Sequence, residues 1–286
     1  MGSRAPRSLD HIVLPVEDLD RAQTRLRALG FTVSPVGRHP FGTSNCCVYL
    51  ADGTFLEPLA VTDEASADKA VAAGNVFVAR DRQYRQVSGE NGLSAVVLAS
   101  GDARSDHARF RKAGISAGDL LEFSRPFVDS TGKSDGATFR LAFAAEEASP
   151  EPFFFTCQRV RSPRVNRTAL QEHRNGVTRV AEILFSSADP ERHRSFLGTF
   201  LDAEPGPADP GRLVFDLSNA SVSVARDEAA GYGMRASAIR FLMRDSTAKL
   251  RSILRADRIE HRASGGSVIV PPAPGQGVTF IFESET

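Results

Sequence analysis

One order of predicted elements recurs four times along the 286 residues of this chain. In each copy a short apolar strand is followed by a helix, and further strands complete the unit. The copies are predicted at 9–61, 93–159, 177–226 and 236–283. Repetition of this kind constrains the fold strongly, because each copy must bury its apolar face against a partner. The sequence therefore predicts an α+β fold built from four βαβββ units.

The helix of each copy has a recognisable beginning. In the first copy Asp18 precedes apolar residues at helical spacing, and Gly30 follows the last of them. Aspartate is a preferred N-cap residue, and glycine is a common helix terminator. The corresponding starting residues are Asp102 in the second copy, Asp189 before Pro190 in the third, and Asp245 or Ser246 in the fourth.

A single unit of this type can bury only one face of its sheet. We therefore expect the units to pair into two cupped mixed sheets, one in an N-terminal domain at 1–165 and one in a C-terminal domain at 166–286. Two domains also suit the length, because a single core rarely grows beyond ~250–300 residues. The polar, arginine-rich stretch 159–175 is predicted to be the linker.

Composition excludes several classes of partner. The formal net charge is zero, so no global charge favours nucleic acid or an acidic membrane. No apolar run approaches the ~20 residues that span a bilayer, and the first residues lack the apolar stretch of a signal peptide. Cys46, Cys47 and Cys157 fit no disulfide framework. These features predict a cytoplasmic protein with reduced cysteines.

Two polar residues interrupt apolar strands of the first unit. Strand alternation places His11 on one face with Val13, and it places Ile12 and Leu14 on the more apolar face. Glu57 lies in the last strand of the same unit. A buried polar group without a partner costs ~1–3 kcal/mol, so both side chains should face a cavity or each other. They are candidates to bind a divalent metal, to hydrogen-bond to each other, or to bind a substrate directly.

Several segments resemble a known superfamily. The opening sequence Leu-Asp-His-Ile-Val-Leu-Pro-Val-Glu-Asp-Leu-Asp and the βαβββ repeat resemble vicinal oxygen chelate proteins, which include glyoxalase I, bleomycin-resistance proteins and extradiol dioxygenases. Residues 37–45, 153–158 and 173–177 resemble, more narrowly, the bacterial glyoxalase-like domain proteins. The resemblance covers nearly the whole chain. It implies the fold more strongly than the reaction.

In this superfamily the concave side of the sheet holds a metal, with ligands from the first and last strands of each unit. The resemblance therefore implies that His11 and Glu57 bind Zn, Ni, Mn or Fe, and that Glu57 could also act as a base. In the second unit, however, Ala95 occupies the position of His11, and Thr156 or Cys157 occupies that of Glu57. The ligand set is incomplete, because catalytic zinc usually has three protein ligands.

Further polar residues are candidates for substrate binding, each with a plainer alternative. His39 faces the cavity or lies in an exposed loop, and Thr43 and Asn45 bind a ligand or form a turn. Arg159 binds a carboxylate or phosphate at the mouth of the cup, or is solvated in the linker. Cys157 is a possible third ligand or a cavity-lining thiol.

The C-terminal cup is predicted to hold fewer ligands than the N-terminal cup. Glu283 lies near a last-strand ligand position, or is a lone surface carboxylate. The positions that correspond to His11 and Glu57 are apolar there: Ala181, Ala238 and Val224. The other histidines are expected on the surface or in the linker: His107, His173, His193 and His261. Any chemistry should therefore lie in the N-terminal cup.

Two functions follow from these observations. The first is a metal-dependent enzyme acting on a small organic substrate by lyase, isomerase or dioxygenase chemistry. The alternative is a metal-free protein that binds or sequesters a small molecule, as bleomycin-resistance proteins do. Four units complete two cups within one chain, so the protein is expected to be a monomer or a homodimer.

Overall fold

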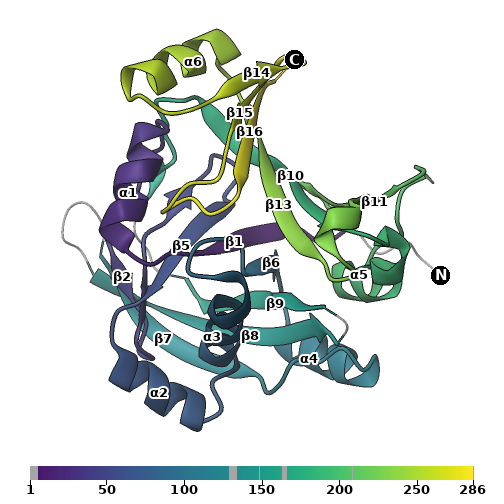
Figure 1. The fold of residues 1–286 in the computed structure, drawn as a ribbon. Coiled ribbons are helices and arrows are strands. Elements are labelled where there is room, and N and C mark those ends of the chain that lie inside the picture. The colour runs from purple at the N-terminus through teal and green to yellow at the C-terminus, as the bar shows by residue number, and fades with distance from the viewer. Residues whose placement is uncertain (1–5, 129–133, 148, 163–165, 208, 286) are drawn as a thin grey trace.

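The computed structural model describes residues 6–128, 134–147, 149–162, 166–207 and 209–285. Its strands form two mixed sheets, one from each half of the chain (Figure 1). The predicted α+β fold with paired units and two mixed sheets is confirmed. No helix of the described residues is long and apolar enough to cross a membrane.

The first sheet contains nine strands in the order β2-β3-β5-β1-β6-β9-β8-β7, with β4 also paired to β5. Strands β1 and β6 lie antiparallel at its centre, and each pairs in parallel with the last strand of its own unit. Two units therefore meet about the β1–β6 junction. The strands are β1 (Leu9–Pro15), β2 (Gly37–Arg38), β3 (Thr43–Asn45), β4 (Val48–Tyr49), β5 (Phe55–Val61), β6 (Ala95–Ala99), β7 (Leu121–Val128), β8 (Ser134–Glu146) and β9 (Ser149–Arg161).

The predicted helices of the first half form where their caps indicate. The Asp18 carboxylate accepts backbone N–H groups at the start of α1 (Leu19–Ala28), and Asp102 does the same for α4 (Ala103–Lys112). Residues 31–36 join no sheet, and Phe31 at the start of this segment packs against Phe241 of the C-terminal half.

Two further helices connect the first unit to the second. They are α2 (Glu64–Ala72) and α3 (Val76–Ser88), which follow Asp63 and Asn75 as capping residues. The sequence analysis left this segment unassigned. Of α2 only Ala67 is buried, so its sequence carries little apolar periodicity.

The second sheet has the strand order β11-β12-β10-β13-β16-β15-β14. Its third repeat unit has two strands after the helix, so this unit is shorter than the βαβββ pattern. Ser246, rather than Asp245, caps α6. The elements are β10 (Val177–Ser187), α5 (Arg194–Leu201), β11 (Arg212–Asp216), β12 (Ser221–Arg226), β13 (Arg235–Met243), α6 (Thr247–Ala256), β14 (Arg262–Ser264), β15 (Ser267–Val270) and β16 (Thr279–Ser284), with short 3₁₀ turns η1 (Thr168–Leu170), η2 (Pro190–His193) and η3 (Glu228–Ala230).

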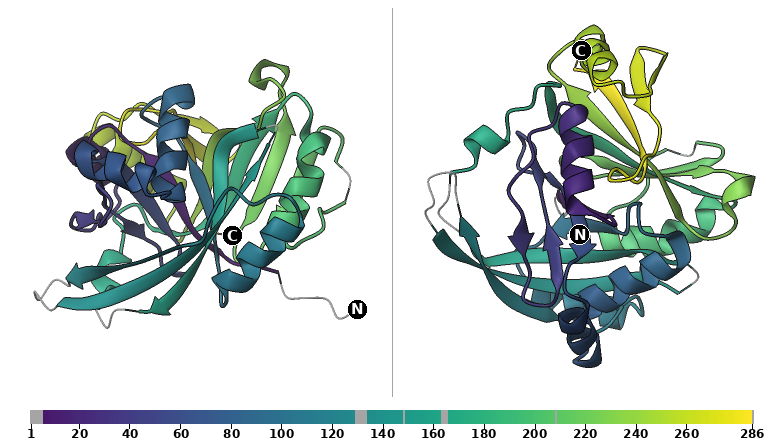
Figure 2. Two further views of the ribbon diagram at one scale, coloured as in Figure 1. Left: turned by 90° about the horizontal axis from the view of Figure 1, so that it is seen from below. Right: turned by 60° about the vertical axis from the view of Figure 1, so that its left-hand side comes forward.

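One apolar cluster extends through both halves. It includes Ile12 and Leu14 of β1 and the phenylalanines of the second sheet. The ring of Phe31 lies 5.7 Å from that of Phe241 and 6.1 Å from that of Phe282. Figure 2 shows α1 beside the C-terminal strands. The division into domains at 165 and 166 stays a prediction, because the halves share this core.

A second cluster covers the opposite face of the first sheet. It contains Val13, Ala95, Phe155 and Cys157, with Phe77 from α3 packed above them. The predicted alternation along β1 is therefore confirmed, since Ile12 and Leu14 belong to the other cluster. This face carries the cavity described next.

Candidate functional site

The N-terminal half encloses a cavity of about 220 Å³. Aromatic rings form most of its walls, and charged side chains lie at its floor and mouth. The lining residues are Asp10, His11, His39, Phe41, Tyr49, Phe55, Glu57, Phe77, Phe123, Arg125, Phe139, Leu141, Phe155, Cys157, Arg159, Ser162 and Arg167. Pockets for drug-sized ligands measure ~300–1,000 Å³, so this cavity suits a smaller molecule.

His11 lies at the floor between two carboxylates. Its Nδ1 atom is 2.6 Å from Oδ1 of Asp10, and its Nε2 atom is 3.3 Å from Oε2 of Glu57. The imidazole stacks on Phe55, with ring centroids 4.4 Å apart, and meets the edge of Phe155. The Nδ1 contact has the length of a strong hydrogen bond, whereas the Nε2 contact is longer than an ordinary one.

This arrangement keeps the cluster charged. Burial alone would lower the pKa of His11, but the hydrogen bonds and charges of Asp10 and Glu57 outweigh burial and raise it. Burial alone would raise the pKa of Glu57, yet the contact with His11 lowers it to about 2. The pKa of Asp10 is lowered as well, against the effect of burial, chiefly by His11 and then by Arg159. The two carboxylates therefore favour the protonated form of His11.

Asp10 was missed by the sequence analysis. Strict alternation would place it on the face opposite His11, but the β1–β6 register shifts between Leu9 and His11. A bulge of this kind redirects side chains, so both Asp10 and His11 line the cavity. Neither composition nor periodicity signals such a bulge.

Arg159 of β9 lines the cavity, and its guanidinium binds Asp10. The Nη2 atom is 3.0 Å from Oδ1 of Asp10, and Nη1 donates to Oδ2. Such a two-pronged contact is a strong form of carboxylate binding. A role for Arg159 in binding a ligand anion stays a prediction, and the structure shows a positioning contact.

Asn45 and Arg125 extend the network. The Asn45 side-chain amide donates to Oε1 of Glu57, and its Oδ1 accepts from Nη1 of Arg125 at 3.1 Å. Arg125 comes from β7 of the second unit, and no motif marked it in the sequence. A Cβ atom on Gly37 would lie 2.7 Å from Nη1 of Arg125. Glycine at this position therefore leaves room for the guanidinium.

His39 is buried beside the cavity rather than exposed in a loop. Its Nδ1 atom is 2.8 Å from the Thr43 hydroxyl, and its Nε2 atom is 3.7 Å from Oε1 of Glu57. The ring stacks on Phe41 with a centroid distance of 5.1 Å. Burial and the nearby charge of Arg125 lower the pKa of His39 to about 3, so this imidazole is neutral.

In the second unit, the residues at the positions that correspond to His11 and Glu57 are Ala95 and either Thr156 or Cys157. Cys157 faces the cavity, and strand alternation directs Thr156 to the other side. Burial raises the pKa of the Cys157 thiol well above its usual range, so the thiolate that a metal requires is disfavoured. Ala95 packs in the apolar cluster.

These donors do not complete a metal site. Among the described residues, no group of three His, Cys, Asp or Glu side chains could hold a metal ion. His11 and Glu57 supply two donors, and catalytic zinc usually takes three. Glu57 is also bound by Asn45. The expected Zn, Ni, Mn or Fe stays a prediction that this donor set does not support.

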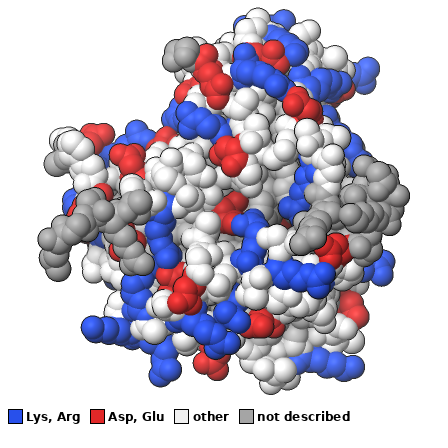
Figure 3. Space-filling model, turned by 180° about the vertical axis from the view of Figure 1, so that it is seen from behind, with Lys and Arg blue, Asp and Glu red and all other residues white. Residues whose placement is uncertain are grey.

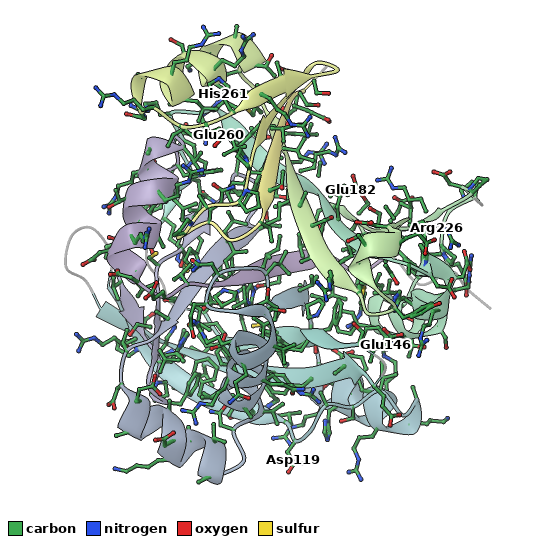
Figure 4. The ribbon with its side chains drawn as sticks, in the orientation of Figure 1. Asp119, Glu146, Glu182, Arg226, Glu260 and His261 are labelled. Atoms are coloured by element: carbon green, nitrogen blue, oxygen red, sulfur yellow. The ribbon has the colours of Figure 1, made fainter. Side chains whose placement is uncertain are left out.

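The C-terminal sheet differs from its prediction. Ala181 was expected to face the open side, but the β10–β13 register shifts between Val180 and Glu182, and Glu182 takes that side instead (Figure 4). Arg212 and Ser223 donate to its Oε1, and the Arg240 Nε atom lies 3.1 Å from its Oε2. Its carboxylate therefore has partners on three neighbouring strands.

Two histidines predicted outside the core are buried between the halves. His193 lies 2.6 Å from Glu146 and 2.9 Å from the Ser187 hydroxyl, so its placement on the surface was wrong. His173 in the linker accepts the Thr32 N–H through Nδ1 and donates from Nε2 to a backbone carbonyl. Glu146 and Thr32 are remote in sequence from these histidines, so no local pattern indicates the two contacts.

Known structures share this architecture. A hypothetical protein from Staphylococcus aureus is 15% identical, with a TM-score of 0.69 over 97% of this chain and 99% of that one. A mutant of 4-hydroxymandelate synthase from Streptomyces coelicolor is 11% identical, with a TM-score of 0.62 over 98% and 93%. The Mn(II)-bound glyoxalase from Novosphingobium aromaticivorans is 12% identical, with a TM-score of 0.55 over 98% and 83%. At these identities the likeness concerns the fold.

Sequence comparison gives the family. No curated protein matches the chain. The glyoxalase-like domain model matches residues 9–201, which is more than half of the sequence and includes the whole cavity. The chain therefore belongs to the glyoxalase-like domain family.

Proposed function

We propose that the N-terminal cavity binds a small carbonyl compound and polarises its carbonyl through the Nε2–H group of protonated His11, without a resident metal. The observation that carries this proposal is the asymmetry of the His11 contacts. Nδ1 is held tightly by Asp10 at 2.6 Å, whereas Nε2 has a loose contact of 3.3 Å with Glu57. A ligand oxygen can therefore take the Nε2 proton as a hydrogen-bond donor.

The surrounding residues suit this role. Asp10 and Glu57 keep the imidazole charged, and Arg159 fixes Asp10. Aromatic side chains form most of the cavity walls and can pack against an unsaturated molecule. A hydrogen bond from a charged donor contributes ~1.5–3 kcal/mol, or roughly ten- to a hundredfold in affinity.

Glu57 is poorly suited to act as the base that the sequence resemblance implies. A general base works best when its pKa lies near the operating pH, and that of Glu57 is lowered to about 2. We assign to Glu57 the stabilisation of the imidazolium.

The test uses acetophenone labelled with ¹³C at the carbonyl, and ethylbenzene as a control of similar shape without the oxygen. We expect acetophenone to bind at least tenfold more tightly than ethylbenzene, with its carbonyl stretch moved to lower wavenumber. His11→Gln should abolish the movement, while His261→Gln, outside the cavity, should preserve it.

A pH series on the unmodified protein provides a second readout that needs no folded variant. The shift of the acetophenone carbonyl stretch to lower wavenumber should be present near pH 6 and disappear as the pH rises through the raised pKa of His11. Equal binding of acetophenone and ethylbenzene, or a signal independent of pH, would refute the proposal. Bound metal at one equivalent per chain would support the metal-dependent alternative instead.

A further inference from the structure

A second cavity adjoins the first. It measures about 620 Å³, and the two cavities share His39, Tyr49, Arg125 and Arg167 in their walls. It lies between the segment 34–40, strand β7 and the η1 turn. Because four side chains border both spaces, the inner cavity and this outer chamber lie side by side.

The charge of the outer chamber has one sign. Arg38, Arg125 and Arg167 line it, and none of its described lining residues is an aspartate or glutamate. Arg38 is exposed and, within the described part of the chain, has no ion-pair partner. Guanidinium groups bind carboxylate and phosphate oxygens in pairs, so the chamber favours an anion.

The remaining walls are largely apolar. Prolines and aliphatic side chains surround the arginines: Pro35, Val36, Pro40, Pro126, Ala169 and Leu170. An occupant should therefore carry its negative charge on an apolar stem. A fully hydrated inorganic ion would leave this apolar surface uncovered.

Arg125 connects the chamber to the floor of the inner cavity. It lines both spaces and donates to Asn45, which in turn donates to Glu57. A Cβ atom at Gly37 would come within 2.7 Å of the Arg125 guanidinium and 2.8 Å of the Asn45 oxygen. Because Gly37 has no positive φ, the lack of a side chain here serves close approach and not backbone conformation.

From these observations we infer that the outer chamber is a subsite for an anionic tail. The ligand would be a keto acid or a keto phosphate, with its carbonyl head in the inner cavity and its anion beside Arg38. The position of the head rests on the proposed function. The recognition of the tail is an independent claim about the outer chamber.

Isothermal titration calorimetry can separate the two claims with three probes. They are 4-oxo-4-phenylbutanoate, its neutral amide, and acetophenone as the head alone. We expect the acid to bind at least about tenfold more tightly than the amide at low salt, because a carboxylate strengthens the hydrogen bond that the Arg38 guanidinium donates. Arg38→Gln should remove most of this preference, and Arg38→Lys should restore part of it.

Arg255→Gln is the matched control, because Arg255 is an exposed arginine on α6 and lines neither cavity. Equal affinity for acid and amide, or a preference unchanged in Arg38→Gln, would overturn the tail subsite. If the acid is preferred through Arg38 but the carbonyl stretch of bound acetophenone does not shift to lower wavenumber, the tail subsite stands and the proposed function fails. Absence of binding by all three probes would overturn both.

Discussion

Replacing Glu57 by glutamine tests the charged floor of the cavity. Burial alone would raise the pKa of Glu57, but the hydrogen bond and charge of His11 outweigh burial and lower this pKa from 4.5 to about 2. A carboxyl whose pKa is lower in the folded than in the unfolded state stabilises the protein above pH 4.5, and this stability is lost as the pH falls toward the folded value. A difference of this size corresponds to about 3 kcal/mol at pH 6 and about 1 kcal/mol at pH 3.

We therefore expect the free energy of unfolding of Glu57→Gln to be about 3 kcal/mol lower than that of the unmodified protein at pH 6. At pH 3 this difference between the two proteins should be smaller by about 2 kcal/mol. Urea unfolding followed by far-UV circular dichroism measures both values, since the chain has no tryptophan. Glu17→Gln, an exposed carboxylate, should show no such narrowing. A difference that stays constant between pH 6 and pH 3 would refute the buried ion cluster.

Three further changes test other parts of the structure. Arg159→Met should lower the free energy of unfolding at pH 7 by only about 1 kcal/mol, because the Arg159 side chain is about a third exposed. Urea unfolding at pH 7 and at pH 3 should show that this loss shrinks as Asp10 becomes protonated. Phe31→Ala should cost about 3–5 kcal/mol and destabilise both halves together, whereas loss of one half alone in a urea titration would contradict a shared core. Dialysis against a chelator should leave the melting temperature unchanged, and elemental analysis showing stoichiometric metal that disappears in His11→Ala would restore the metal-dependent reaction.

The sequence predicted the parts of the site that depend on local pattern. Alternation along one strand was enough to place His11 on the cavity face and Ile12 in the core. The capping residues Asp18 and Asp102 located two helices, because an N-cap acts within its own first turn. These features need no knowledge of the rest of the chain.

The parts that failed depend on irregularities or on distant segments. Asp10 and Glu182 each follow a register shift, which reverses the face that alternation assigns. Arg125 reaches Asn45 across 80 residues of sequence, and His193 reaches Glu146 across 47. Such contacts exist only after the sheets have assembled, so no local pattern indicates them.

Both halves bind a buried acidic side chain with arginines, although their sequences do not suggest it. The helix that covers the N-terminal sheet explains why the cavity lies in that half. In each half the first strand contains a register shift that turns an acidic side chain to the open face, and arginines from other strands bind it: Arg159 holds Asp10, and Arg212 and Arg240 hold Glu182. Paired charge alone therefore does not make a site. The N-terminal sheet is also covered by α3, whose Phe77 lines the cavity. The third repeat unit is one strand short, and Arg212 and Arg240 remain partly exposed. Closure over the N-terminal sheet removes water from the ion cluster and strengthens its electrostatics, which is why we place the chemistry at His11.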